Sequence, residues 1–127
     1  MLNVPDGVAI LVYLSLGVHV LRMFLPHRID TLVLFLGGFI PARLTELVSG
    51  AAGFSLWDVL SRVAPLIGYA FLHADWMHVI FNLMWLMVFG SIVGRRLGED
   101  REGTIRLIEI FLISGIAGAL VHWVCLL

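Results

Sequence analysis

The sequence predicts an all-α membrane protein, a polytopic bundle with three transmembrane helices. Hydrophobic residues make up 61% of the 127-residue chain and charged residues 13%, whereas soluble domains are about half apolar and a quarter charged. The mean hydropathy is +1.03. Three stretches also have close to the roughly 20 apolar residues that cross a bilayer, and they span residues 7–25, 76–94 and 104–127.

The first predicted span, residues 7–25, begins after the sequence Pro5-Asp6 and is ended by Pro26. Its single charged side chain, Arg22, lies close enough to the end of the span that we expect it to snorkel toward water. The residues before the span carry no basic side chain, as a cleavable signal peptide would. The segment is therefore predicted to be a retained anchor.

The second and third spans are separated only by the charged turn "RRLGEDREG", residues 95–103. The third span starts directly after this turn and runs to Leu127 without a polar tail. From this abrupt end we expect that the reading frame is truncated.

Residues 26–75 are predicted to form a long structured loop within a single membrane domain, residues 1–127. Its two apolar runs, residues 31–43 and 56–72, are interrupted by Gly, Pro and charged residues. Each is too short or too broken to cross a bilayer alone, so interfacial or re-entrant helices are expected.

The distribution of charge predicts the orientation. The chain has eight Lys and Arg residues, all of them Arg, and half of them crowd the short turn: Arg95, Arg96, Arg101 and Arg106. Short loops rich in Arg stay in the cytoplasm, so we expect a cytoplasmic N-terminus and an external long loop. The net charge of −1 argues against a nucleic-acid partner. Membrane lipid is the expected environment, and the lone Cys125 is interpreted as an apolar filler.

A cluster of polar residues precedes the second span in the stretch "FLHADWMHVIFN", residues 71–82. Asp75 lies where a helix N-cap is needed, so His78 falls in the first helical turn. Asn82 follows four residues later and shares a helix face with His78. His73 is predicted to belong to the end of the loop.

Spacing alone leaves two interpretations of the His78 and Asn82 pair open. The pair either forms hydrogen bonds between helices or lines a functional site in a water-filled cavity. A metal site that also includes His73 and Asp75 is disfavoured, because residues five apart do not converge on a straight helix and Asn is a poor ligand. No metal or cofactor is predicted.

The stretch resembles the second transmembrane helix of rhomboid intramembrane serine proteases, whose pattern is His-x4-His-x3-Asn before a Leu/Trp-rich helix. Here the three positions are His73, His78 and Asn82. The segments "FIPARL", residues 39–44, and "GRRLG", residues 94–98, also fit bacterial members of that family. The resemblance implies the first three helices of a six-helix core.

The resemblance also implies roles for these residues. Rhomboids cut a peptide bond with a Ser–His dyad, in which the Ser belongs to a Gly-x-Ser-Gly motif on the fourth helix and the His to the sixth. The positions matching His78 and Asn82 line the oxyanion side of that site, where donors in a water-poor cavity stabilise developing negative charge. His73 would order the junction between loop and helix.

The sequence departs from the family pattern in two places. The Trp-Arg pair of the family loop has only a loose counterpart in Arg62. None of the six serines lies in Gly-x-Ser-Gly, and the nearest is Ser114 in "LISG". Ser114 and His122 are eight residues apart on the third span, about 12 Å along a helix, which is too far for direct proton transfer. Ser114 is therefore interpreted as a packing residue and His122 as a buried hydrogen-bonding residue.

Small residues recur every four positions on both later spans, as Gly90, Gly94 and Gly98 and then as Ser114 and Gly118. Such stripes allow helices to approach closely. Glu109 is expected to pair with Arg106 or with an arginine at the end of the second span.

The predicted function is therefore that of the N-terminal half of a rhomboid serine endopeptidase in a bacterial inner membrane. The substrate would be a transmembrane protein. The chain as given has no nucleophile and no general base, so it is expected to be inactive alone. The alternative is a non-catalytic rhomboid-like membrane protein that binds transmembrane helices or a partner subunit.

Overall fold

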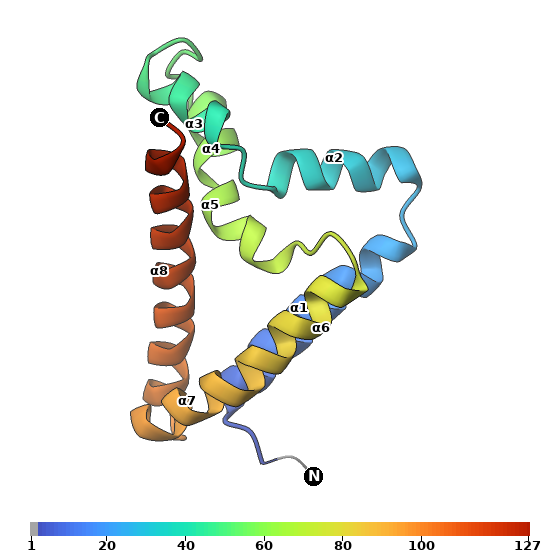
Figure 1. Cartoon of the computed structure of the whole chain (residues 1–127), viewed down its shortest axis with the longest axis vertical. Coiled ribbons are helices and arrows are strands. Elements are labelled where there is room, and N and C mark those ends of the chain that lie inside the picture. Colours follow the sequence, from blue (N-terminus) through green and yellow to red (C-terminus); the bar gives the residue numbers. More distant parts are fainter. Residues whose placement is uncertain (1–2) are drawn as a thin grey trace. The chain divides into compact units, whose positions relative to one another are not determined.

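The computed structural model describes residues 3–127, and these residues form helices joined by short loops, with no strand among them (Figure 1). Three helical stretches are long and apolar enough to cross a membrane, namely α1 (Asp6–Met23), the stretch Trp76–Leu97 and α8 (Arg101–Cys125). The predicted all-α fold class with three candidate spans is confirmed.

The first two candidate spans end at positions that differ from the predicted ones. α1 ends at Met23, before the predicted residue 25, because Pro26 disfavours the helical conformation at the residue preceding it. The second span is longer than predicted, since α6 (Trp76–Trp85), the π-helical turn η2 (Leu86–Gly90) and α7 (Ser91–Leu97) follow one another without a break.

The turn after α7 has a glycine and an aspartate at its two ends. Gly98 ends α7 with a φ of 108°, a left-handed conformation that glycine adopts without a steric penalty. Asp100 then caps α8, because its Oδ1 accepts the backbone N–H of Gly103 at 2.8 Å. A Cβ on Gly103 would clash with the carbonyl oxygen of Gly98. A residue with a Cβ at position 103 would therefore not fit in this tight turn.

The chain divides into two compact units. Unit 1 contains residues 3–24 and His73–Leu112, and so holds α1, α6, η2, α7 and the first part of α8. In this unit α1 runs beside α6 and η2 (Figure 1). Val8, Leu11 and Val79 are the most deeply buried side chains of the unit.

Glycines bring the helices of unit 1 together. A Cβ on Gly90 would lie 3.3 Å from Cγ2 of Val8, and a Cβ on Gly94 would lie 3.0 Å from Cβ of Pro5. The close approach predicted from the small-residue stripe is confirmed for Gly90 and Gly94, whereas Gly98 belongs to the turn.

Unit 2 contains Leu25–Leu72 together with the end of α8, residues 113–127. Its helices are α2 (His27–Gly37), α3 (Pro41–Val48), α4 (Leu56–Val63), α5 (Pro65–Gly68) and the short η1 (Tyr69–Phe71). The long loop is thus built from short helices, and their depth in the membrane stays a prediction.

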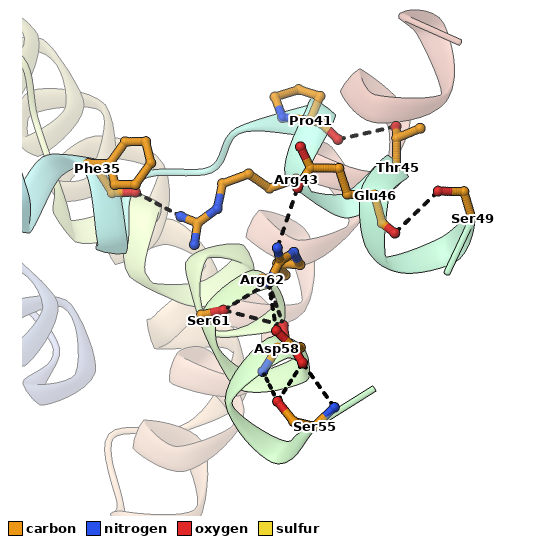
Figure 2. A network of polar contacts seen from close by, with 10 residues as sticks. All are labelled: Phe35, Pro41, Arg43, Thr45, Glu46, Ser49, Ser55, Asp58, Ser61 and Arg62. Carbon is orange, nitrogen blue, oxygen red and sulfur yellow. Dashed lines mark hydrogen bonds and ion pairs between the residues drawn. The ribbon is translucent and has the colours of Figure 1, made fainter. Parts of the chain in front are cut away.

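α2 and α3 meet at a bend of 50°. The bend requires Gly38, because a Cβ there would lie 2.5 Å from the carbonyl oxygen of Leu34. Arg43 of α3 links the two helices across the bend (Figure 2), since its Nη1 donates to the carbonyl of Phe35 in α2 at 2.9 Å. The Arg43 guanidinium also lies 5.0 Å from the centre of the Phe35 ring.

α4 begins with a reciprocal cap between Ser55 and Asp58 (Figure 2). The Ser55 hydroxyl accepts the Asp58 backbone N–H at 3.1 Å, and the Asp58 carboxylate accepts the Ser55 backbone N–H at 3.0 Å. The Ser55 hydroxyl also donates to the Asp58 carboxylate. This bond is the largest cause that lowers the pKa of the Asp58 carboxyl, followed by the bond from the Ser55 backbone N–H and by a smaller contribution from Arg62. Arg62 in turn lies 3.4 Å from Oε2 of Glu46 and so ties α4 to α3.

Two hydrogen bonds join the loop helices of unit 2 to the end of α8. The Tyr69 hydroxyl donates to the carbonyl of Gly115 at 2.6 Å, and the Trp123 indole N–H donates to the Thr45 hydroxyl at 2.9 Å. His122 is exposed, not buried as predicted. Adjacent side chains on a helix point about 100° apart. Because Trp123 points toward Thr45, the side chain of His122 points away from it.

The predicted ion pair of Glu109 is replaced by a different one. Arg106 pairs with Glu102, four residues earlier in α8. This order, with the acid N-terminal to the base, is the favourable one for an i, i+4 pair.

Candidate functional site

The candidate site is located at the N-terminal end of α6, where the sequence predicted it. Asp75 has the extended conformation of an N-cap, with φ −149° and ψ 175°. Its carboxylate accepts the backbone N–H of His78 at 2.8 Å. The predicted N-cap is confirmed, and it fixes His78 in the first turn of α6.

His78 and Asn82 both lie on α6 and are both exposed. Their spacing of four residues places them one helical turn apart on one face. Neither side chain donates or accepts a hydrogen bond with another described residue. The donors of this face are therefore available to a ligand, and within residues 3–127 no bond between helices engages them.

His73 precedes α6 and is only 3% exposed. Its backbone carbonyl accepts Nη1 of Arg22, on α1, at 2.7 Å. Its ring lies edge-on to the ring of His78, with 5.2 Å between the ring centres. His73 thus lies at the loop-to-helix junction, and the ordering role that the resemblance implied for it stays a prediction.

His19 of α1 was not among the predicted site residues, and the predicted environment of Arg22 is wrong. His19 is 6% exposed and Arg22 is 9% exposed, so Arg22 is buried in unit 1 and does not snorkel. The carbonyl of His73 explains this burial, because it offers the guanidinium an acceptor inside the protein. The signal was present in the sequence, since Ser15, His19 and Arg22 form a polar stripe at spacings of four and three on an otherwise apolar span.

Ser114 and His122 do not form a catalytic pair in the described chain. Both lie on the continuous helix α8 and are exposed, and eight residues separate them by about 12 Å along the axis. Among residues 3–127, no group of three or more His, Cys, Asp or Glu side chains is arranged to hold a metal ion. What the described residues offer at the start of α6 is the hydrogen-bond donors of His78 and Asn82.

Comparison with known proteins identifies the family. A family model described as the rhomboid domain matches residues 60–127, a stretch that includes His73, His78 and Asn82. Rhomboid-like protein 11, chloroplastic, from Arabidopsis thaliana is 38% identical over 79 residues, which is 62% of this chain and 26% of that protein. The chain thus spans about a quarter of the length of this relative. No solved structure matches the chain.

The matched stretch covers more than half of the 127 residues and includes two of the three helices that could cross a membrane. The chain is an integral membrane protein that belongs to the rhomboid family.

Proposed function

We propose that the chain supplies the oxyanion side of the active site of an intramembrane serine endopeptidase. The substrate is a transmembrane protein, cleaved near the outer face of the membrane. Asn82 donates an amide N–H, and His78 a ring N–H, to the scissile carbonyl oxygen as negative charge builds on it. The proposed reaction uses no metal and no cofactor.

The observation that carries this proposal is the arrangement of His78 and Asn82. Both are exposed hydrogen-bond donors on one face of α6, one turn apart, just after the Asp75 cap. Donors on a capped helix are held in place before the reaction, so little reorganisation of the site is needed when the oxyanion forms. Membership of the rhomboid family supports the same assignment.

The serine nucleophile and the histidine base of this reaction lie outside the 127 residues. None of the six serines lies in Gly-x-Ser-Gly. The chain alone is therefore expected not to hydrolyse peptides, and the proposal requires a further part of the native protein that carries both groups.

The missing motif favours a second candidate function, that of a non-catalytic rhomboid-like protein which binds transmembrane helices or a partner subunit. In that case His78 and Asn82 would contact a bound helix. Their replacement by Ala would then change binding and leave no peptidase activity to be lost.

The first experiment is the intact mass of the native protein purified from its own membranes. A mass of about twice 14.1 kDa, as six spans would require, is the result expected for the peptidase. A mass of 14.1 kDa would exclude a catalytic half on the same chain and leave the binding function.

The second experiment measures cleavage of a single-span substrate by the native protein in liposomes. Asn82→Ala is expected to lower kcat by about 10²-fold to 10³-fold, the effect of losing one oxyanion donor, while the helix content stays unchanged. Met77→Ala is the matched control, because Met77 is an exposed neighbour on a different face of α6. Undiminished cleavage by a folded Asn82→Ala protein would overturn the proposed role.

We also propose that the protein lies in a bacterial inner membrane with its N-terminus in the cytoplasm. Support for this orientation comes from the four arginines in and beside the short turn between α7 and α8, because short arginine-rich loops remain on the cytoplasmic side. This orientation puts His78 and Asn82 near the outer surface.

A further inference from the structure

Four side chains of unit 1 gather where α1 meets the start of α6. His19 and Arg22 lie three residues apart on α1 and so share a face of that helix. The His19 ring lies 4.6 Å from the Trp76 ring and 6.5 Å from the His73 ring, measured between ring centres. Arg22 donates to the carbonyl of His73 in a buried bond.

The segment held by this cluster has no regular secondary structure. Residues 72–75 lie between η1 and α6, so the hydrogen-bond ladder of a helix does not define their conformation. Arg22, which precedes His73 by 51 residues in the sequence, binds this segment through its guanidinium. The start of α6 is thereby located relative to α1.

The same segment sets the surroundings of His78. The carboxylate of Asp75 holds the His78 backbone, and the buried His73 ring lies against the exposed His78 ring. A ring that packs against a fixed neighbour has fewer accessible rotamers than a ring in open solvent. The contacts thus lead from α1, through His73, to the exposed imidazole of His78.

Packing alone does not account for His19. Its Nδ1 is buried and has no hydrogen-bond partner among the described residues. A buried polar atom without a partner costs stability, which an apolar ring of similar shape would avoid. The buried imidazole of His19 therefore lowers the stability of the protein, and close packing alone does not require an imidazole at this position.

We propose that His19 and Arg22 are positioning residues which, acting through His73, hold the His78 ring in one orientation. The proposal rests on the proposed function for its purpose, because a donor at the oxyanion is effective only when its N–H points correctly before reaction. Neither residue is proposed to touch the substrate.

The test is the NMR spectrum of the full chain in detergent micelles with ¹³C in the Cε1 atoms of its five histidines. The wild-type His78 ring is expected to give one resonance, and Arg22→Gln is expected to shift or split it. Arg22→Lys keeps a donor for the His73 carbonyl and is expected to restore the single resonance. Arg95→Gln is the matched control, because Arg95 also donates to a backbone carbonyl of unit 1, that of Asn3.

An unchanged His78 resonance in a folded Arg22→Gln chain would overturn the proposal, as would an equal change in Arg95→Gln. If Arg22→Gln does not fold, the decision falls to His19→Ala, which removes the ring, and His19→Phe, which keeps one. The resonance is expected to move in both, because neither variant keeps the imidazole. An unmoved resonance in a folded His19→Ala chain contradicts the proposal, and an unmoved resonance in a folded His19→Phe chain contradicts a positioning role of His19 beyond packing.

The spectrum does not depend on peptidase activity. A native protein that fails to cleave substrate while its His78 resonance responds to Arg22 would refute the proposed function and leave the positioning role intact.

Discussion

At the scale of single residues, Asp58 gives the loop a pH-dependent cap. Its pKa lies below the ordinary value of 3.8 because Ser55 binds the carboxylate, first through its hydroxyl and then through its backbone N–H. Arg62 adds a smaller contribution in the same direction. Since the pKa is lower in the folded protein than in the unfolded chain, Asp58 stabilises α4 fully above the unfolded value. That stabilisation is lost as the pH falls through the folded value.

We predict that Ser55→Ala raises the pKa of Asp58 toward 3.8, because the first and largest cause of the lowering is removed. A ¹³C NMR titration of the Asp58 carboxyl carbon measures this. Ser49→Ala is the control, since the Ser49 hydroxyl donates to the backbone carbonyl of Glu46 and not to a carboxylate. A pKa of Asp58 that is identical in Ser55→Ala and wild type would contradict the assigned cause.

Residues differ in how far local sequence predicts their roles. The Asp75 cap was predictable, because an N-cap and the N–H that it accepts lie within one turn of sequence. The same holds for the shared face of His78 and Asn82. The bond from Arg22 to the His73 carbonyl was not predictable, because its partners are 51 residues apart and a backbone carbonyl has no sequence signature.

At the scale of helices, two glycines in predicted spans serve different purposes. Gly94 of α7 lies against Pro5 and Leu107, and a Cβ there would lie 3.0 to 3.3 Å from their side chains. Gly17 of α1 has no atom within 4 Å of an added Cβ. The sequence alone does not distinguish them, because both are small residues in an apolar helix.

We predict that Gly94→Ala lowers the free energy of unfolding by about 1–3 kcal/mol, the usual cost of overpacking a tight contact. Gly17→Ala is the matched variant and is expected to raise it by about 0.5–1 kcal/mol, since Ala is the better helix former. Unfolding of both chains in mixed micelles, followed by circular dichroism, gives the two values. Equal stability of the two variants would show that Gly94 is not a close contact.

Helix ends were predicted less well than helix existence. From hydropathy, the second span was predicted to end at residue 94, yet α7 continues to Leu97. The helix extends further because arginines near a helix C-terminus stabilise the helix even though they are polar. The π-helical turn at Leu86–Gly90 lies inside a continuous apolar run, so composition carried no sign of it. The short loop helices follow from local caps such as that of Ser55.

At the scale of the whole molecule, composition was sufficient for the fold class. An apolar chain must satisfy its backbone hydrogen bonds internally in lipid, which leaves helices as the only open choice for spans of this length. The number of crossings is a separate question. Three helices qualify alone, and the bent pair His27–Gly37 and Pro41–Val48 could make a fourth crossing or a re-entrant loop.

Gly and Pro interrupt the apolar run between α2 and α3, and the two short helices meet at a bend of 50°. Neither helix is long enough to cross a bilayer alone, and this favours three crossings by the chain. Three crossings put the ends of this chain on opposite sides of the membrane, and four put them on the same side. If the chain crosses three times, the proposed cytoplasmic location of the arginines beside the short turn predicts a cytoplasmic N-terminus. The number of membrane crossings and the orientation of the chain can therefore be tested together, with one reporter group near each end of the chain.

The reporters are thiols, since Cys125 is the one cysteine of the sequence and is exposed. We predict that a membrane-impermeant maleimide added outside intact cells labels Cys125. In a Cys125→Ala background, the thiol of Asn3→Cys is expected to react only after the membrane is permeabilised. Labelling of both positions from outside would mean that the bent pair crosses the membrane. Labelling of only the Asn3→Cys thiol from outside would keep three crossings and reverse the orientation, placing His78 and Asn82 near the cytoplasmic surface.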